Sequence, residues 1–175
     1  MKRLIIIGLG GHGRVVADAA LISGYSVAGF LDDRKEQNVG IAKEYKILGG
    51  VSDAKSILQK NDFFIVAIGN NEIRKGIFEN LAELAMPATI IHTSAVIPPD
   101  VEIGVGTVVL ANAVINAGCK IGNNCIINSL ALVDHETVIG SHSHIAQGSI
   151  IGSNCTLPEM YVTELGQRLK SRTKI

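Results

Sequence analysis

Residues 103–139 read IGVGTVVLANAVINAGCKIGNNCIINSLALVDHETVI, and an aliphatic side chain returns in this stretch at every sixth position. The period extends from residue 91 to residue 157, and a small or β-branched residue stands four positions after each aliphatic one from Ile91 to Ile151. Such a sustained short period indicates a repeat architecture. The aliphatic column consists of Ile91, Ile97, Ile103, Val109, Ile115, Ile121, Ile127, Val133, Ile139, Ile145, Ile151 and Leu157. The second column consists of Ala95, Val101, Thr107, Ala113, Cys119, Cys125, Ala131, Thr137, Ser143, Ser149 and Cys155.

An amphipathic helix does not fit this period. At about 100° per residue, six residues turn through about 240°, which would scatter the aliphatic column over three faces. Short strands joined by corners fit better, because the aliphatic residues would stack inside a prism and parallel pairing between coils would satisfy the backbone. Three hexads make an 18-residue coil, and Gly104, Gly122 and Gly140 recur at that spacing. We therefore expect a parallel β-helix over residues 91–160.

The composition argues against several kinds of partner. The 175 residues carry 16 basic and 16 acidic side chains, so nucleic acid and anionic membranes are not expected to bind. The apolar run Leu4 to Ile7 is too short for a signal peptide, and we expect a cytoplasmic protein without membrane insertion. All three cysteines fall in the second column, so we expect core thiols and neither a disulfide nor a metal site.

The first half of the chain follows a different pattern, in which apolar strand candidates alternate with helix candidates. This alternation predicts a Rossmann-like α/β domain over residues 1–90. The expected strands are residues 4–8, 26–31 and 63–68, and the expected helices are residues 14–23 and 71–84, with a further short helix after Ser52.

The segment Gly8-Leu9-Gly10-Gly11-His12-Gly13 matches G-x-G-x-x-G, and Asp32-Asp33 follows about twenty residues later. Glycines let backbone N–H groups approach a phosphate at a helix N-terminus, and a carboxylate at the next strand end can hold ribose or base donors. Binding of NAD(P) is one interpretation of this motif. However, residues 1–90 are too few to include the second mononucleotide-binding unit of a fold that binds a dinucleotide. The motif therefore fits a nucleotide of some kind, and we expect the His12 side chain to face it.

Five segments carry a more specific pattern: Gly8 to Gly13, Phe30 to Asp33, Asp62 to Arg74, Ile91-His92, and Asp134-His135-Glu136 followed by His144. Together they resemble the hexapeptide-repeat N-acetyltransferases of UDP-4-amino-4,6-dideoxy sugars, as in bacillosamine and perosamine pathways, and their sialic-acid O-acetyltransferase relatives. The resemblance extends to about Ser149. It implies a left-handed β-helix and a homotrimer.

The same resemblance implies two binding sites. The N-terminal half would bind the UDP-amino sugar, with Asp32 and Asp33 on the uridine. Acetyl-CoA would be the co-substrate, contacted by His144, and no metal would be needed. The other implied sugar-nucleotide positions are Gly10, Gly11, His12, Gly69 and Glu72, although a solvated carboxylate in the first turn of a helix is the plain alternative for Glu72.

His135 is the candidate for chemistry, because it stands between two carboxylates, Asp134 and Glu136. An imidazole has a suitable pKa to take a proton as an amine attacks a thioester, and a carboxylate on its other nitrogen would fix the tautomer. The resemblance assigns His135 as general base and Glu136 as its partner, and Asp134 is the rival partner. His142 is expected to be a solvated corner residue.

The hexad is lost after Leu157, where the resembling family continues through further coils. We expect residues 161–175 to form an atypical tail or cap, with a short helix from Glu164 covering the open end. This departure leaves several functions open. They are an acetyl-CoA-dependent N-acetyltransferase, a nucleotide-sugar-binding trimer with impaired catalysis, an O-acetyltransferase acting on a sugar hydroxyl, and an NAD(P)-linked reductase.

Overall fold

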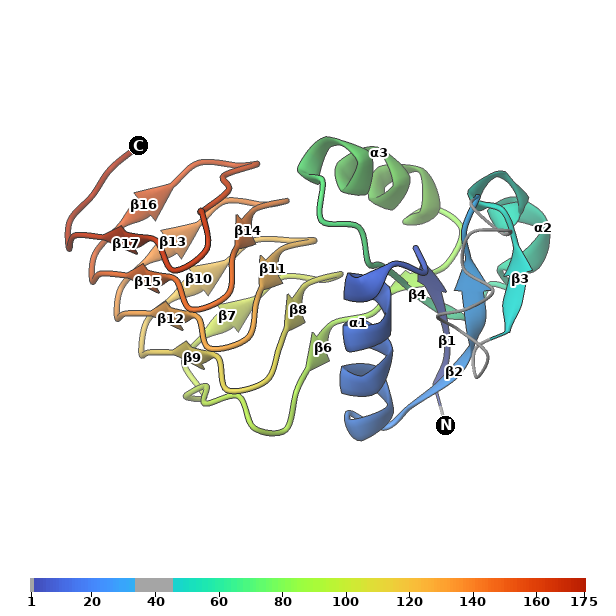
Figure 1. The fold of residues 1–175 in the computed structure, drawn as a ribbon, viewed down its shortest axis with the longest axis horizontal. Helices are drawn as coiled ribbons and strands as arrows, with labels where there is room; N and C mark the ends of the chain where they lie inside the picture. Colours follow the sequence, from blue (N-terminus) through green and yellow to red (C-terminus); the bar gives the residue numbers. More distant parts are fainter. Residues whose placement is uncertain (1, 34–45) are drawn as a thin grey trace. The chain divides into compact units, whose positions relative to one another are not determined.

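The computed structural model describes residues 2–33 and 46–175. The chain divides into two compact units, Met1–Ala88 and Thr89–Ile175. Every helix among the described residues belongs to the first unit, and the second unit is built from two-residue strands (Figure 1).

A five-stranded parallel sheet of order β3-β2-β1-β4-β5 forms the centre of the first unit. The strand order reverses between β1 and β4, which makes the unit Rossmann-like, as predicted. Its elements are β1 (Lys2–Ile7), α1 (Gly11–Ile22), β2 (Tyr25–Leu31), β3 (Ile47–Gly49), the 3-10 helix η1 (Val51–Asp53), α2 (Ala54–Ile57), β4 (Phe63–Val66), α3 (Asn71–Leu81) and β5 (Met86–Pro87).

The sequence of β1 explains its central place. Its last four residues, Leu4 to Ile7, are all fully buried. A strand covered on both faces of a parallel sheet needs such a continuous apolar run. Ile5 and Ile7 pack in one cluster with Phe78 and Leu81 of α3.

Helix α1 begins at Gly11, three residues before the predicted start at Arg14. It approaches the end of β1 so closely that a Cβ added to Gly13 would lie 2.0 Å from the carbonyl oxygen of Gly8. The third glycine of the motif is therefore required for packing of the helix against the strand.

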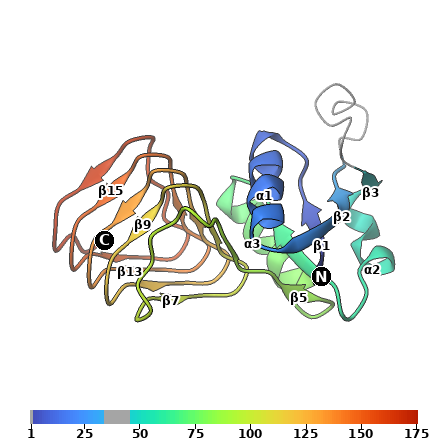
Figure 2. The ribbon, with the colours of Figure 1, turned by 90° about the horizontal axis from the view of Figure 1, so that it is seen from below.

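The second unit is a left-handed parallel β-helix, as predicted. Its coils stack in three parallel sheets, and each strand pairs with the strand 18 residues further on (Figure 2). The strands are β6 (Ile90–Ile91), β7 (Glu102–Ile103), β8 (Val108–Val109), β9 (Val114–Ile115), β10 (Lys120–Ile121), β11 (Ile126–Ile127), β12 (Leu132–Val133), β13 (Val138–Ile139), β14 (His144–Ile145), β15 (Ile150–Ile151), β16 (Thr156–Leu157) and β17 (Arg168–Leu169).

The two predicted columns form the interior of the prism. The aliphatic residues from Val109 to Leu157 are buried in one cluster, which also contains the three cysteines. Cys119, Cys125 and Cys155 are free thiols, and burial raises the pKa of the Cys119 thiol above its ordinary value. A thiol that stays protonated is a poor nucleophile, which agrees with a packing role for these residues.

Each corner of the β-helix contains one residue with left-handed backbone. From Gly106 to Arg172, every sixth residue has a positive φ between 52° and 74°. Only four of these twelve positions hold glycine; the others include Leu130 and Glu136, although such residues rarely adopt this conformation. The backbone N–H of Glu136 donates to the carbonyl of Ala117 in the preceding coil, a bond that helps to hold the corner.

The glycines that recur every 18 residues are explained by crowding between coils. A Cβ added to Gly122 would lie 2.5 Å from the backbone nitrogen of Ser141 in the next coil, and Gly104 and Gly140 are crowded in the same way. Gly152, outside that column in the sequence, would meet the nitrogen of Ser171 at 2.5 Å.

The predicted tail over residues 161–175 is wrong, because these residues continue the β-helix. Strand β17 pairs with β15, and single bridges join Val162 to His144 and Lys174 to Thr156. The pattern was hidden by Thr163, which occupies an aliphatic position but is only 3% exposed. Its hydroxyl oxygen accepts a hydrogen bond from the backbone N–H of Ala146 at 2.7 Å, so the polar group is satisfied inside the prism.

No helix among residues 2–33 and 46–175 is both long enough and apolar enough to cross a membrane.

Two glycine substitutions test the packing of the first unit. We expect Gly13→Ala to destabilise the protein by about 1–3 kcal/mol or more, because its methyl group would overlap the backbone at Gly8. Gly76→Ala is the matched control, since Gly76 lies exposed in α3 with open space at its Cβ position. The control should stabilise the helix by up to about 1 kcal/mol. Chemical denaturation measures the free energy of unfolding of both variants. Equal values for the two would contradict the packing argument.

Candidate functional site

The glycine loop of the first unit is joined to the end of β2 by a buried carboxylate. Asp32 is 4% exposed, and its Oδ2 accepts a hydrogen bond from the backbone N–H of Leu9 at 2.6 Å. Gly8, with φ of 102°, turns the chain between β1 and α1, and Gly10 is the N-cap residue of α1. Asp32 therefore fixes the loop, a role that the sequence analysis did not assign to it.

A cleft of about 550 Å³ opens at the carboxyl ends of these strands, where ligands bind in doubly wound sheets. Both predicted carboxylates, Asp32 and Asp33, line it together with Gly8. The Asp33 carboxylate is exposed and accepts a hydrogen bond from the backbone N–H of Val51 at 2.7 Å. The remaining lining residues are apolar: Val51, Ile68, Ile73 and Ile77.

The other predicted sugar-nucleotide residues are close in sequence to residues that line this cleft, but they do not line it themselves. Gly10, Gly11 and His12 form the start of α1, with Gly11 exposed and His12 half-buried. Gly69 and Glu72 are exposed where β4 leads into α3. Ile68 and Ile73, which the sequence did not indicate, line the cleft on either side of this turn.

The turn between β4 and α3 is held by Arg74, whose role the sequence analysis also missed. Arg74 is 1% exposed, and its guanidinium donates to the carbonyls of Ile68 at 3.0 Å and Gly69 at 3.2 Å, and to Oδ1 of Asn71 at 2.6 Å. Asn70 caps the helix by accepting a bond from the N–H of Ile73. The sequence contained a signal for this role, namely an arginine one turn into a predicted helix that follows Gly-Asn-Asn.

The second unit presents His135 at an exposed corner after β12. Asp134 Oδ1 accepts hydrogen bonds from the side-chain amide of Asn116 and from the backbone N–H of His135, both at 2.9 Å. These two bonds lower the pKa of the Asp134 carboxyl below its ordinary value. Within the described residues, no hydrogen bond joins the His135 ring to Asp134 or Glu136. The contacts therefore do not distinguish which of the two carboxylates is the partner of His135.

Glu136 lies in left-handed backbone at the same corner, with φ of 59°. A Cβ added to Gly118 would lie 2.7 Å from Glu136 Oε1, so this side chain lies against the adjacent coil. Glu136 also lines a shallow hollow of about 390 Å³, together with Asn154, Thr156, Arg172 and Lys174.

The two later histidines differ from each other in their surroundings. His144 is half-buried on β14, and its Nε2 lies 3.2 Å from Nδ2 of Asn128. His142 was expected to be solvated, but it is 7% exposed, and its Nδ1 lies 2.9 Å from Nδ2 of Asn124. The expectation failed because His142 stacks on a buried residue 18 positions earlier, a contact that a local pattern does not reveal.

His135 and His144 lie on different parts of the prism. His135 follows β12 and precedes β13, whereas His144 belongs to the sheet of β14, β11, β8 and β6. A single chain therefore does not bring the two predicted histidines together. In the part of the chain that the structure describes, no cluster of three or more His, Cys, Asp or Glu side chains could hold a metal ion.

A Rossmann-like unit followed by a hexapeptide β-helix with an exposed histidine between carboxylates places the chain in the class of hexapeptide-repeat acyltransferases. Residues 3–81 match the model of the PglD N-terminal domain. The acetyltransferase domain of PglB from Neisseria gonorrhoeae is 32% identical, with a TM-score of 0.81 over 99% of this chain and 88% of that one. The chain belongs to this family of hexapeptide-repeat sugar acetyltransferases.

Two further relatives are informative. UDP-N-acetylbacillosamine N-acetyltransferase of Bacillus subtilis is 35% identical over 119 residues, which are 63% of this chain and 52% of the relative. The match thus spans about half the length of that curated protein. PerB from Caulobacter crescentus, solved with CoA and GDP-perosamine, is 27% identical, with a TM-score of 0.75 over 99% of this chain and 86% of that one.

Replacing Asn116 tests the hydrogen bonds around Asp134. Because Asn116 lowers the pKa of Asp134 in the folded protein, Asn116→Ala should raise that pKa toward its ordinary value. The lowered pKa contributes stability above the pKa of the unfolded chain, near pH 4, and this contribution is lost as the pH falls through the folded value. The variant should therefore have a smaller free energy of unfolding at neutral pH. This free energy should also decrease less than that of the wild type as the pH is lowered.

An NMR titration of the side-chain carboxyl carbon of Asp134 measures this shift directly. Asn80→Ala, on the exposed face of α3, serves as the control and should leave the titration unchanged. An Asp134 pKa that is the same in Asn116→Ala and in the wild type would refute the assigned cause.

Proposed function

We propose that the protein is an acetyl-CoA-dependent N-acetyltransferase that modifies the 4-amino group of a UDP-4-amino-4,6-dideoxy sugar. The observation that carries the proposal is the family membership of the whole chain, combined with His135 exposed between two carboxylates. Relatives include a UDP-N-acetylbacillosamine N-acetyltransferase and a perosamine N-acetyltransferase, and the PglB acetyltransferase domain is solved in complex with acetyl coenzyme A.

The nucleotide of the acceptor would bind in the cleft of the first unit. The cleft volume of about 550 Å³ lies within the usual range for small-molecule sites. Its wall is apolar at Ile68, Ile73 and Ile77, which suits the face of a base, whereas the Asp33 carboxylate can accept hydrogen bonds from ribose or base donors. Backbone N–H groups at the start of α1 would provide donors for phosphate, which is the role expected of Gly10 and Gly11.

His135 would act as the general base in a direct transfer. The sugar amine attacks the thioester carbonyl and forms a C–N bond, while His135 takes a proton from the nitrogen. The tetrahedral intermediate then expels the sulfur of coenzyme A as the C–S bond breaks, and the departing thiolate takes the proton from the His135 imidazolium. Asp134 or Glu136 would stabilise the imidazolium, and the buried cysteines take no part.

A homotrimer is part of this proposal, because a site that uses both His135 and His144 needs a second chain. The two residues lie on different faces of one prism, so the corner of one subunit would meet a face of its neighbour. His144 would contact acetyl-CoA from that neighbouring face. The continued β-helix over residues 161–175 supports the active enzyme over the alternative of impaired catalysis, which an early end of the repeat at Leu157 had suggested.

A thiol-release assay with acetyl-CoA and the UDP-4-amino sugar tests the reaction. We expect turnover by the wild type and a loss of at least about a hundredfold in kcat for His135→Ala, because general-base catalysis typically contributes that much. His92→Ala is the control: its Nδ1 accepts a bond from the backbone N–H of Ser94 in an exposed turn, so activity should be retained. Absence of wild-type turnover, or full turnover by His135→Ala, would refute the proposal; turnover only with hydroxyl acceptors would indicate O-acetylation.

A further inference from the structure

The corner that carries His135 is fastened to the neighbouring coils through its main chain. The carbonyl of His135 accepts a hydrogen bond from the N–H of Asn154 in the following coil at 2.9 Å. The N–H of Glu136 donates to the carbonyl of Ala117 in the preceding coil at 3.0 Å. The N–H of His135 differs, because a side chain satisfies it: Asp134 Oδ1 accepts its bond at 2.9 Å. The path of the main chain at His135 therefore depends on where the Asp134 carboxylate is held.

The Asp134 carboxylate is held by Asn116, which occupies the same position one coil earlier. Asn116 Nδ2 donates to the same Oδ1 at 2.9 Å. Asn116 is itself fixed, because it is half-buried and its backbone N–H donates to the carbonyl of Val133 at 2.9 Å. The two bonds to Oδ1 lower the pKa of the Asp134 carboxyl, so the group is ionised at neutral pH and accepts both as charge-assisted bonds. The Asn116 amide, the Asp134 carboxylate and the His135 main chain thus form one chain of hydrogen bonds.

Glu136, the other carboxylate beside His135, is not part of this chain of bonds. Its side chain lies against Gly118 in the preceding coil, where an added Cβ would be 2.7 Å from Oε1. Within the part of the chain that the structure describes, no hydrogen bond joins the Glu136 carboxylate to Asn116 or Asp134. A change at Asn116 would therefore reach His135 through Asp134.

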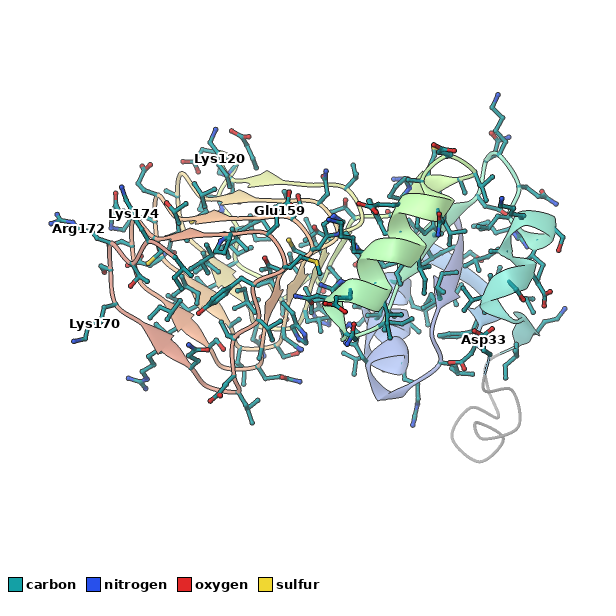
Figure 3. All side chains as sticks on the ribbon, turned by 90° about the horizontal axis from the view of Figure 1, so that it is seen from above. Asp33, Lys120, Glu159, Lys170, Arg172 and Lys174 are labelled. Carbon is teal, nitrogen blue, oxygen red and sulfur yellow. The ribbon has the colours of Figure 1, made fainter. Side chains whose placement is uncertain are left out.

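A purely structural role is the alternative for Asn116, because other side chains also bond across adjacent coils. Lys120, in the same coil as Asn116, projects outward from the β-helix (Figure 3), and its Nζ lies 2.8 Å from Oε1 of Glu102, 18 residues earlier. That bond joins strands β10 and β7 and does not reach His135. If both bonds only stabilise the β-helix, their loss should have similar effects on activity.

We propose that Asn116 is a positioning residue for acetyl transfer: through Asp134 it holds the main chain of His135, and with it the imidazole, in place to take the proton from the attacking nitrogen. This role rests on the proposed function, whereas the chain of hydrogen bonds does not. A general base has to lie within about 2.6–3.2 Å of the atom whose proton it takes, so a small displacement of the corner slows the reaction.

Three variants separate positioning from stability. Asn116→Leu keeps the approximate shape of the side chain and removes the donor, Asn116→Gln keeps an amide donor, and Lys120→Met removes an equally short bond from the same coil. The thiol-release assay measures kcat and KM for each variant. Hydrogen exchange followed by NMR measures the protection of the His135 backbone amide without any substrate. Circular dichroism checks the fold, and Asn116→Ala is the second donor-free variant if leucine prevents folding.

We expect Asn116→Leu to lower kcat at least about tenfold while both KM values stay within about twofold of wild type, because a misplaced base slows the chemical step and not binding. The His135 amide should exchange at least about tenfold faster in this variant, since its acceptor is no longer held. Asn116→Gln should retain most of the wild-type kcat. Lys120→Met should stay within about twofold of wild type in both measurements, because an exposed ion pair contributes little.

Several outcomes would overturn the role of Asn116. They are wild-type kcat in Asn116→Leu, an equal loss of kcat in Asn116→Gln or Lys120→Met, a loss of kcat without faster exchange of the His135 amide, and a rise in KM alone. A failure of the proposed function would look different. The His135 amide would still exchange faster in Asn116→Leu than in the control, but the wild type itself would transfer no acetyl group.

Discussion

The second unit depends on one backbone constraint: the chain must turn a corner every six residues. Each corner is made by a residue in the left-handed region, from Gly106 to Arg172 without exception. Eight of these residues have side chains, and each bears a conformational cost that glycine would avoid. The backbone N–H of each of these eight residues donates a hydrogen bond to the preceding coil, and these bonds offset the cost. The inward aliphatic column, the strand register and the outward position of His135 all follow from where the corners fall.

The sequence was sufficient to predict the β-helix because its interior admits few kinds of side chain. Aliphatic residues fill the middle of each side and small residues fill the corners, so burial alone produces a period of six. The same logic led to an error at the end of the chain. Thr163 is polar and hides the period, but hydrogen bonds to the Ala146 N–H and the Ser149 hydroxyl satisfy it inside the prism. Such compensation depends on neighbours in other coils and cannot be recognised from a local pattern.

In the candidate site, too, some features could be predicted from the sequence and others could not. The sequence indicated the glycine loop, Asp32 and Asp33, because a strand, a turn and a helix N-terminus leave local signatures. It did not indicate that Asp32 binds the N–H of Leu9, that Arg74 holds the β4–α3 turn, or that Asn116 bonds Asp134. Each of these contacts relies on the three-dimensional fold: 23 residues separate the first pair and 18 the last.

The pairing of every strand with the strand 18 residues away limits how such a chain can change length. Loss of a single residue within the coils from Ile103 to Leu169 would turn every later interior side chain toward a corner or toward water, whereas gain or loss of a whole coil would preserve all contacts on both sides. Insertions at a corner would leave the register intact, because they project from the surface. Evolutionary variation in this half should therefore proceed in units of one coil, or as loops that leave from its corners.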